Sequence, residues 1–175
     1  TALVTGAGPI GLLAAMLLRM AGLEVHVLDR VDSGPKPDLV RALGASYHAG
    51  TVSEVGFEPD VVVECTGVGR LITDAIQAVA PGGVGCPTGV GSGGRTATGP
   101  SAAALAADAV LKNKVIVGSV NANRRHWYRA GEALARADRK WLARLVTRRE
   151  RPEAFEAALD RRPDDVKVAV QFSST

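Results

Sequence analysis

A glycine turn near the start of the chain constrains the fold more than any other feature. Its pattern is Gly-x-Gly-x-x-Gly, with glycines at positions 6, 8 and 11. Apolar residues 2–5 precede the turn, and a helical apolar stretch over residues 9–21 follows it. Asp29 ends the next apolar segment, 18 positions after Gly11. A strand, a glycine turn, a helix and an acidic strand end together indicate a dinucleotide-binding βαβ unit.

Each residue of the turn has a physical role in such a unit. Gly6 permits the tight turn, Gly8 lets the backbone approach a pyrophosphate, and Gly11 lets the helix pack closely on the strand. Pro9 and Ile10 open the helix, whose N-terminal N–H groups and dipole favour phosphate. A P-loop is excluded, because no Gly-Lys-Ser/Thr follows the turn.

The end of the second strand bears on the choice of cofactor. Asp29 can accept hydrogen bonds from the hydroxyls of the adenosine ribose, which favours NAD. Arg30 could instead meet the 2′-phosphate of NADP, or stack on adenine. A carboxylate would repel that phosphate, so we expect NAD and keep NADP as the alternative.

Strand and helix patterns alternate through the first 122 residues. The predicted strands cover residues 2–5, 24–29, 45–48, 60–65, 83–88 and 114–119, and the predicted helices 9–21, 37–43, 70–80 and 101–112. Residues 89–100 contain five glycines and are typical of a loop, and Ser101 suits the N-cap of the next helix. The alternation predicts an α/β fold with a doubly wound parallel sheet of six strands, the Rossmann fold, in the order 3-2-1-4-5-6.

Ligands of such sheets bind outside the carboxyl ends of the strands. We therefore predict that the cofactor lies across the residues that follow the fourth, fifth and sixth strands: Thr66, Gly67, Val68, Gly89, Val90, Ser119, Val120 and Asn121. Small residues there allow close approach, and the Asn121 amide could bond to a carboxamide. Ordinary turn chemistry also favours Asn and Gly at such positions.

Residues 123–175 follow a different pattern and form a predicted helix–helix–strand extension. A long helix is expected over residues 123–146, with an apolar face that packs in the core: Trp127, Leu134, Trp141 and Leu145. A short helix is expected over 152–160, and the alternating residues 166–172 predict a final strand. Because the six-stranded sheet is already complete, we expect this strand to extend the sheet edge or to pair with a second domain.

Patterns for metal binding and nucleophilic catalysis do not occur. Neither of the two cysteines has a C-x-x-C neighbour, and none of the three histidines has metal-ligand spacing with a cysteine or an acid. No Tyr-x-x-x-Lys pair is present, which excludes a short-chain dehydrogenase. No signal peptide and no run of 18 apolar residues occur, so we expect a soluble cytoplasmic protein with no membrane partner.

Positive charge is concentrated in one segment. Residues 124–151 carry ten Arg or Lys against three acids, whereas the rest of the chain carries eleven against fifteen. A basic segment of this kind indicates either a solvated helix face or nucleic-acid binding. We expect the solvated face and keep nucleic-acid binding as an alternative.

Three stretches carry a resemblance to a known family. Residues 4–15, 60–67 and 117–123 resemble the zinc-dependent medium-chain alcohol dehydrogenase superfamily, and the last of them resembles its glucose dehydrogenase branch most. The resemblance extends over almost the whole chain and includes residues 155–158 and 166–172.

The resemblance implies hydride transfer between a sugar or alcohol and a nicotinamide cofactor, with zinc as Lewis acid on the oxygen. In that superfamily an N-terminal domain carries the zinc ligands, and the glycine turn comes mid-chain. We therefore expect this chain to be the cofactor-binding portion, inactive alone and without its own zinc. Residues 1–122 would form the dinucleotide-binding domain, and 123–175 would return toward the catalytic domain. A stand-alone dinucleotide sensor is the alternative, and self-association stays open.

Overall fold

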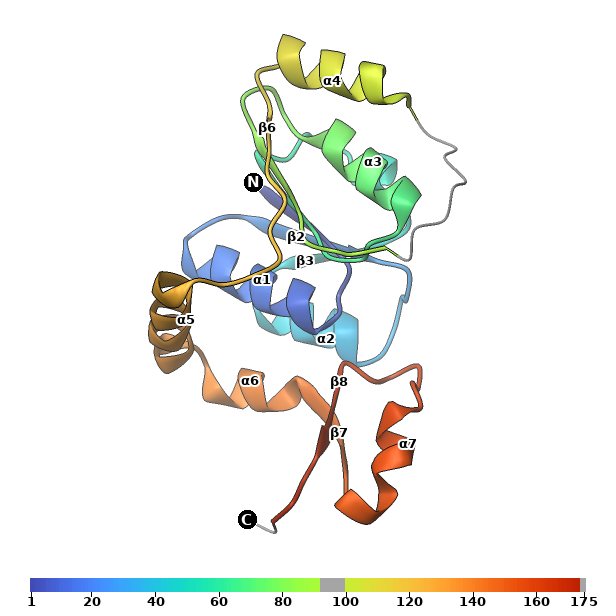
Figure 1. Ribbon diagram of the computed structural model, residues 1–175, viewed down its shortest axis with the longest axis vertical. Helices are drawn as coiled ribbons and strands as arrows, with labels where there is room; N and C mark the ends of the chain where they lie inside the picture. Colours follow the sequence, from blue (N-terminus) through green and yellow to red (C-terminus); the bar gives the residue numbers. More distant parts are fainter. Residues whose placement is uncertain (92–99, 174–175) are drawn as a thin grey trace.

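The computed structural model of the chain describes residues 1–91 and 100–173. Its main sheet has six parallel strands in the order β3-β2-β1-β4-β5-β6 (Figure 1). The strands are β1 (Ala2–Thr5), β2 (Val25–Asp29), β3 (Ser46–Ala49), β4 (Val61–Glu64), β5 (Val84–Pro87) and β6 (Val115–Ile116). The predicted doubly wound order is confirmed. Most of the predicted glycine-rich loop, residues 92–99, lies outside the described residues.

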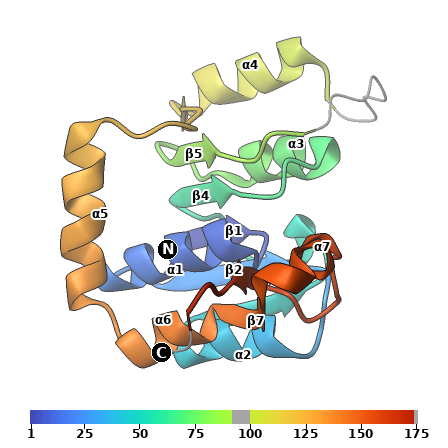
Figure 2. The same cartoon turned by 60° about the horizontal axis from the view of Figure 1, so that its bottom comes forward.

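Helices cover both faces of this sheet (Figures 1 and 2). They are α1 (Pro9–Met20), α2 (Pro35–Ala42), α3 (Gly69–Ala78) and α4 (Ala102–Leu111), with a 3₁₀ turn η1 (Val52–Glu54) before β4. Successive strand residues point to opposite faces, so Val4 packs with Leu12 of α1 while Leu3 packs with Ala75 of α3. Both faces are therefore buried, which explains the nearly continuous apolar strands.

The end of the sheet at β6 is shorter than predicted. Only Val115 and Ile116 pair as a strand, although the chain continues beside β5. Val117 N–H donates to the Gly85 carbonyl at 2.9 Å, and Ser119 N–H donates to the Pro87 carbonyl at 3.2 Å. The predicted cap of α4 is confirmed, because Ser101 Oγ accepts from the Ala104 N–H at 3.2 Å.

The predicted long helix over residues 123–146 is wrong. The structure has two helices, α5 (Arg124–Arg136) and α6 (Arg139–Arg144). Ala137 adopts an extended conformation with ψ of 155°, and Asp138 caps α6 by accepting from the Lys140 N–H at 2.8 Å. An aspartate at an N-cap starts a new helix more readily than it continues an old one.

The predicted apolar face divides at this break. Trp141 is only 3% exposed, and its Nε1 donates to the Leu39 carbonyl of α2 at 2.8 Å. Leu145 is buried beside it. Trp127 is 71% exposed and Leu134 is also exposed, so the core role expected for them is wrong. Figure 2 shows α5 standing beside the sheet, away from the layer that α6 joins.

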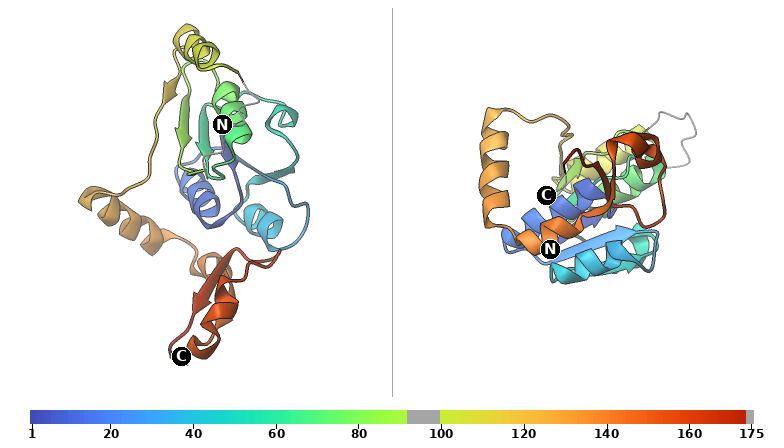
Figure 3. Two further views of the ribbon diagram at one scale, coloured as in Figure 1. Left: turned by 45° about the vertical axis from the view of Figure 1, so that its right-hand side comes forward. Right: turned by 90° about the horizontal axis from the view of Figure 1, so that it is seen from below.

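A second, smaller sheet follows α6. Its two parallel strands are β7 (Val146–Glu150) and β8 (Lys167–Val170), linked through η2 (Pro152–Ala154) and α7 (Phe155–Leu159). The final strand therefore pairs within the chain and does not extend the edge of the main sheet, so that expectation is wrong. Its pairing with a second domain stays a prediction. Figure 3 shows this C-terminal unit, residues 146–170, projecting from the main sheet.

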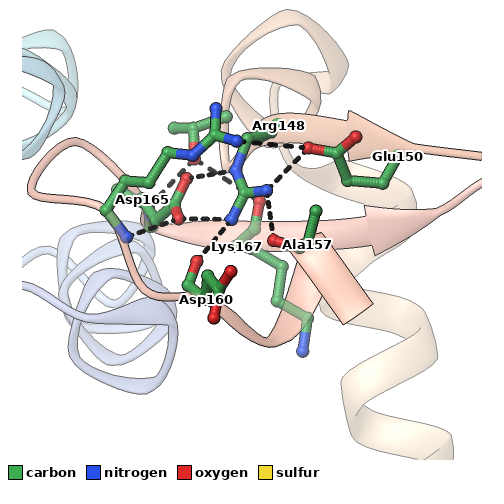
Figure 4. A network of polar contacts seen from close by, with 9 residues as sticks. Arg148, Glu150, Ala157, Asp160, Asp165 and Lys167 are labelled. Atoms are coloured by element: carbon green, nitrogen blue, oxygen red, sulfur yellow. Dashed lines mark hydrogen bonds and ion pairs between the residues drawn. The ribbon is translucent and has the colours of Figure 1, made fainter. Parts of the chain in front are cut away.

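One arginine joins the parts of the C-terminal unit (Figure 4). Arg148 donates to both carboxylate oxygens of Asp165 at 3.0 and 2.8 Å, and to Glu150 at 2.6 Å. It also donates to the carbonyls of Ala157 and Asp160, each at 2.8 Å. These hydrogen bonds raise the pKa of Arg148 and lower the pKa of Asp165 to about 2. The planar guanidinium satisfies polar groups from a strand, a helix and a loop at once.

Candidate functional site

Two of the three glycines in the turn between β1 and α1, Gly6 and Gly11, lie close against other atoms of the protein. Gly6 has a φ of +93°, and its N–H donates to the Leu28 carbonyl at 2.7 Å. A Cβ on Gly6 would lie 2.8 Å from the Thr66 methyl carbon, and one on Gly11 only 1.8 Å from the Gly6 carbonyl oxygen. Any side chain at Gly6 or Gly11 would therefore force the turn, the helix or the neighbouring strand end to move.

Gly8, the third glycine of the turn, is not packed in this way. Gly8 is the N-cap of α1 with φ of −80°, a conformation that other residues adopt. A Cβ there would meet no atom of residues 1–91 and 100–173 within 4 Å. Pro9 follows as the first helical residue, and the Ile10 side chain is exposed. The first N–H groups of a helix lack intrahelical partners. Open space beside a helix N-terminus fits a bound phosphate group.

Asp29 lies at the end of β2 and is engaged by three donors. The Ala7 N–H of the turn donates to Oδ2 at 2.7 Å, and the Arg30 N–H donates to Oδ1 at 2.7 Å. Lys36 Nζ donates to Oδ2 at 3.3 Å. Burial alone raises the pKa of Asp29, but the two N–H groups and the Lys36 charge outweigh it, and that pKa lies below its ordinary value.

Lys36 was not predicted as part of the site. It lies in the first turn of α2, and its side chain and that of Asp29 are each 10% exposed. Seven residues separate the pair, and no sequence motif signals that spacing across a strand-to-helix loop. The Arg30 side chain is exposed at the same corner.

A tyrosine on β3 holds the loop between β2 and α2. The Tyr47 hydroxyl on β3 donates to the Val31 carbonyl. Burial, followed by the negative charge of Asp29, raises the pKa of Tyr47 to about 12. This hydrogen bond ties the backbone two residues beyond Asp29 to β3.

A buried carboxylate organises the turn after β4. Glu64 is 1% exposed, and it accepts from the Thr66 N–H at 2.6 Å, from the Gly67 N–H at 3.1 Å and from the Thr66 hydroxyl. The Glu64 carbonyl accepts from the N–H groups of Thr88 at 2.8 Å and Gly89 at 3.1 Å. The buried Glu64 side chain therefore holds the loop that follows β4.

The turns after β4 and β5 touch through their backbones. Gly67 has a φ of +71°, and a Cβ there would lie 2.8 Å from the Val90 carbonyl carbon. A Cβ on Gly89 would lie 2.2 Å from the Gly67 nitrogen. The side chains of Val68 and Val90 are both exposed. The contact explains why glycines stand at both positions, and it leaves apolar side chains facing outward.

The predicted site residues therefore gather at the carboxyl edge of the sheet. Gly6 approaches Thr66, Gly67 approaches Gly89, and Ser119 bonds to the end of β5. Val120 and Asn121 follow Ser119 and are exposed. Their role in cofactor binding stays a prediction.

The remaining titratable groups do not add a metal centre to this edge. Within residues 1–91 and 100–173, no three His, Cys, Asp or Glu side chains are grouped to hold a metal ion. His26 Nδ1 lies 2.8 Å from His48 Nε2, and burial, with His26, lowers the pKa of His48. Burial raises the pKa of both thiols, Cys65 and Cys86. No helix in the described part of the chain is long and apolar enough to cross a membrane.

The strand order, the glycine turn and the acid at the end of β2 define a Rossmann-type α/β domain. The sequence profile of the family described as "Glucose dehydrogenase C-terminus" matches residues 1–172. The chain belongs to this family, and the resemblance to the glucose dehydrogenase branch is confirmed.

Individual relatives agree with this assignment. The chain is 39% identical to glucose 1-dehydrogenase 2 of Vulcanisaeta moutnovskia over 98% of its length, and 39% identical to glucose 1-dehydrogenase of Thermoproteus tenax over 99%. Among solved structures, Haloferax mediterranei glucose dehydrogenase in complex with NADP, Zn and gluconolactone superposes with a TM-score of 0.87 at 33% identity, over 99% of this chain. This chain covers 50%, 51% and 51% of those three proteins, so it spans about half their length.

Proposed function

We propose that this chain binds a nicotinamide dinucleotide as the cofactor-binding half of a zinc-dependent sugar dehydrogenase. The proposal rests on the space that the described residues leave beside Gly8. Gly6 and Gly11 are required by close contacts within the protein, whereas no contact with the described part of the chain requires a glycine at Gly8. A glycine at an open helix N-terminus is explained by a ligand whose phosphates approach the backbone there.

The cofactor would lie along the carboxyl edge of the sheet. Its pyrophosphate would meet the N-terminus of α1, and its adenosine ribose would meet Asp29 and Arg30. The nicotinamide half would extend across Thr66–Val68, Gly89–Val90 and Ser119–Asn121. When bound, the cofactor supplies hydride transfer. The residues of this chain bind and orient it, and the buried Glu64 keeps the Thr66–Gly67 turn in place.

The zinc, the substrate pocket and the division of the chain belong to the same proposal. The Haloferax relative is about twice as long and was solved with Zn and gluconolactone. We propose that zinc ligands and sugar or alcohol binding reside outside residues 1–175, so this half alone does not turn over substrate. Residues 1–122 would form the dinucleotide domain, and residues 123–175 would face the other half.

The direct test is a titration of the 175-residue chain with NADH and with NADPH, followed by the fluorescence of the reduced cofactor. Saturable binding of at least one of them is expected. In a separate assay with NAD⁺ or NADP⁺ as the hydride acceptor, no oxidation of glucose is expected even when zinc is added. If neither cofactor binds at millimolar concentration, the proposed function is wrong. If glucose is oxidised by this chain alone, the assignment of the chemistry to another part of the protein is wrong.

A further inference from the structure

Two histidines meet on one face of the main sheet, outside the candidate site. His26 lies on β2 and His48 on β3, and the strand register puts His48 opposite Leu28. Residues two apart on a strand point to the same face, so His26 and His48 share the face that carries Leu28. His26 Nδ1 lies 2.8 Å from His48 Nε2, which is a hydrogen-bond distance. The pair therefore adds a side-chain hydrogen bond to the backbone pairing of β2 with β3.

The strand that carries His48 lies at an edge of the sheet. β3 pairs with β2 on one side, and each of its four residues is at least partly exposed. An edge strand with little buried surface opens more easily than a strand in the core, so each bond to its neighbour matters more. β3 also carries Tyr47, whose hydroxyl donates to the Val31 carbonyl. A loss of pairing at β3 would therefore reach the loop between β2 and α2.

The charged groups around the pair favour a proton on one ring. Glu24 Oε1 lies 3.4 Å from His26 Nε2, so a carboxylate faces a protonated His26. On its other side His26 meets the ring of Phe57, with centroids 4.3 Å apart, in the loop before β4. The acids of that loop are engaged elsewhere. Glu54 accepts from the N–H and hydroxyl at the start of η1, and the charge of Glu58 acts on the C-terminus of α4.

A hydrogen bond between two imidazoles depends on how many protons the pair holds. It needs one ring nitrogen that donates and one that accepts. Two neutral rings provide both, and so does a neutral ring beside a protonated one. When both rings are protonated, every ring nitrogen is a donor, so the bond is lost and two like charges lie side by side. Burial, followed by the charge of His26, lowers the pKa of His48, as expected for the ring that takes the second proton.

We propose that His26 and His48 form an acid-sensitive switch at the β3 edge, in which protonation of both rings releases β3 from β2. The bond persists while at least one ring is neutral. The unfolded chain protonates His48 at the ordinary histidine pKa, near 6.5, and the folded chain does so only at a lower pH. The folded state therefore loses stability as the pH falls below about 6.5.

Urea unfolding of the 175-residue chain between pH 8 and pH 5 tests the switch. H48Q places an amide near the position of Nε2, so it keeps a hydrogen-bond partner for His26 but cannot become charged. On acidification, the unfolding equilibrium constant of the unmodified chain is expected to rise more steeply than that of H48Q. The difference is up to about tenfold per pH unit, the limit for one proton. The control H126Q removes the exposed histidine of α5 and is expected to follow the unmodified chain. Equal pH dependence in H48Q and the unmodified chain would overturn the inference.

Hydrogen exchange shows which strand responds. In the unmodified chain, the protection factors of the β3 amides are expected to fall from pH 7 to pH 5 relative to those of β1. In H48Q the ratio of the two is expected to stay constant. If β3 and β1 lose protection together in the unmodified chain, the acid response is not local to β3 and the inference is wrong.

NMR titration of the histidine rings keeps the test decisive if H48Q folds poorly. His48 of the unmodified chain is expected to titrate below the ordinary histidine pKa. In H26N the neighbouring charge is absent, so the His48 titration is expected to move to higher pH. An identical His48 titration in H26N and the unmodified chain would show that the two rings are not coupled, which also overturns the inference.

Discussion

The close approach of α1 to the glycine turn predicts a large cost for the substitution G11A. The new Cβ would lie 1.8 Å from the Gly6 carbonyl oxygen, 3.0 Å from the Gly6 carbonyl carbon and 3.3 Å from a methyl carbon of Val4. The two shortest contacts are with backbone atoms, so no side-chain rotation relieves them. The helix must retreat or the turn must open.

The size of that movement sets the expected loss of stability. Separating the Cβ and the oxygen from 1.8 Å to an ordinary contact of 3.4 Å requires a shift of about 1.6 Å. A gap of only about 0.5–1 Å already forfeits about a quarter to a half of each lost van der Waals contact. Leu12, Ala15 and Met16 of α1 are buried in the core and would all lose contacts. Overpacking a core costs about 1–3 kcal/mol. We expect G11A to fall at the upper end, about 3 kcal/mol, because backbone meets backbone.

Urea unfolding followed by circular dichroism measures this loss, and thermal unfolding provides a second reading. For a chain of this length, about 3 kcal/mol corresponds to a decrease in Tm of roughly 6–12 °C. G8A is the matched control, because its Cβ would meet no atom of the residues that the structure describes within 4 Å and its φ suits alanine. We expect G8A to retain stability, since Gly-to-Ala changes at compatible positions stabilise by about 0.4–1 kcal/mol. We also expect it to weaken cofactor binding. If G11A were as stable as G8A, the packing argument for the turn would be refuted.

Two further predictions concern titration. R148M should lower the free energy of unfolding at pH 7, because it removes the partner of the Asp165 carboxylate. The difference from the unmodified chain should shrink as the pH falls from about 4 to about 2, because the stabilisation from the depressed pKa of Asp165 is lost over this range. Urea unfolding at several pH values measures this difference, and a difference that stays constant would contradict the assigned ion pair. Because the pKa of Tyr47 is raised, the unfolded chain loses the phenol proton near pH 10 and the folded chain near pH 12. The free energy of unfolding should therefore fall between these pH values, and Y47F should remove that part of the fall. An unchanged alkaline stability profile in Y47F would count against the buried hydroxyl.

The order of the main sheet was predictable because each strand and helix of the first 116 residues carries its own local pattern. Apolar runs flanked by glycine and proline mark the strands, and the crossover rule for parallel strands leaves few topologies. In the C-terminal unit the predicted helix over 152–160 and strand over 166–172 correspond to α7 and β8, but β7 was not predicted. β7 has the sequence Val-Thr-Arg-Arg-Glu, and its middle arginine is half-buried because Asp165 and Glu150 neutralise it. A strand held by an ion-pair network has no hydrophobic period to detect.

The break between α5 and α6 has a different cause. Trp127, Leu134, Trp141 and Leu145 keep helical spacing across the break, so periodicity alone continues the helix. Asp138 was a visible capping residue, but a single aspartate inside a helical pattern is also compatible with a surface position. The deciding fact is tertiary: Trp141 reaches the Leu39 carbonyl only after the chain has changed direction.

The candidate site shows the same division between local and tertiary information. The glycine motif encodes backbone geometry directly, and the structure places Gly6 and Gly11 in close contact as that motif requires. The meaning of Asp29 depends on Lys36, which approaches from the next helix across a loop. The charge at the end of β2 is therefore set by Asp29 and Lys36 together, and the acid alone does not give it.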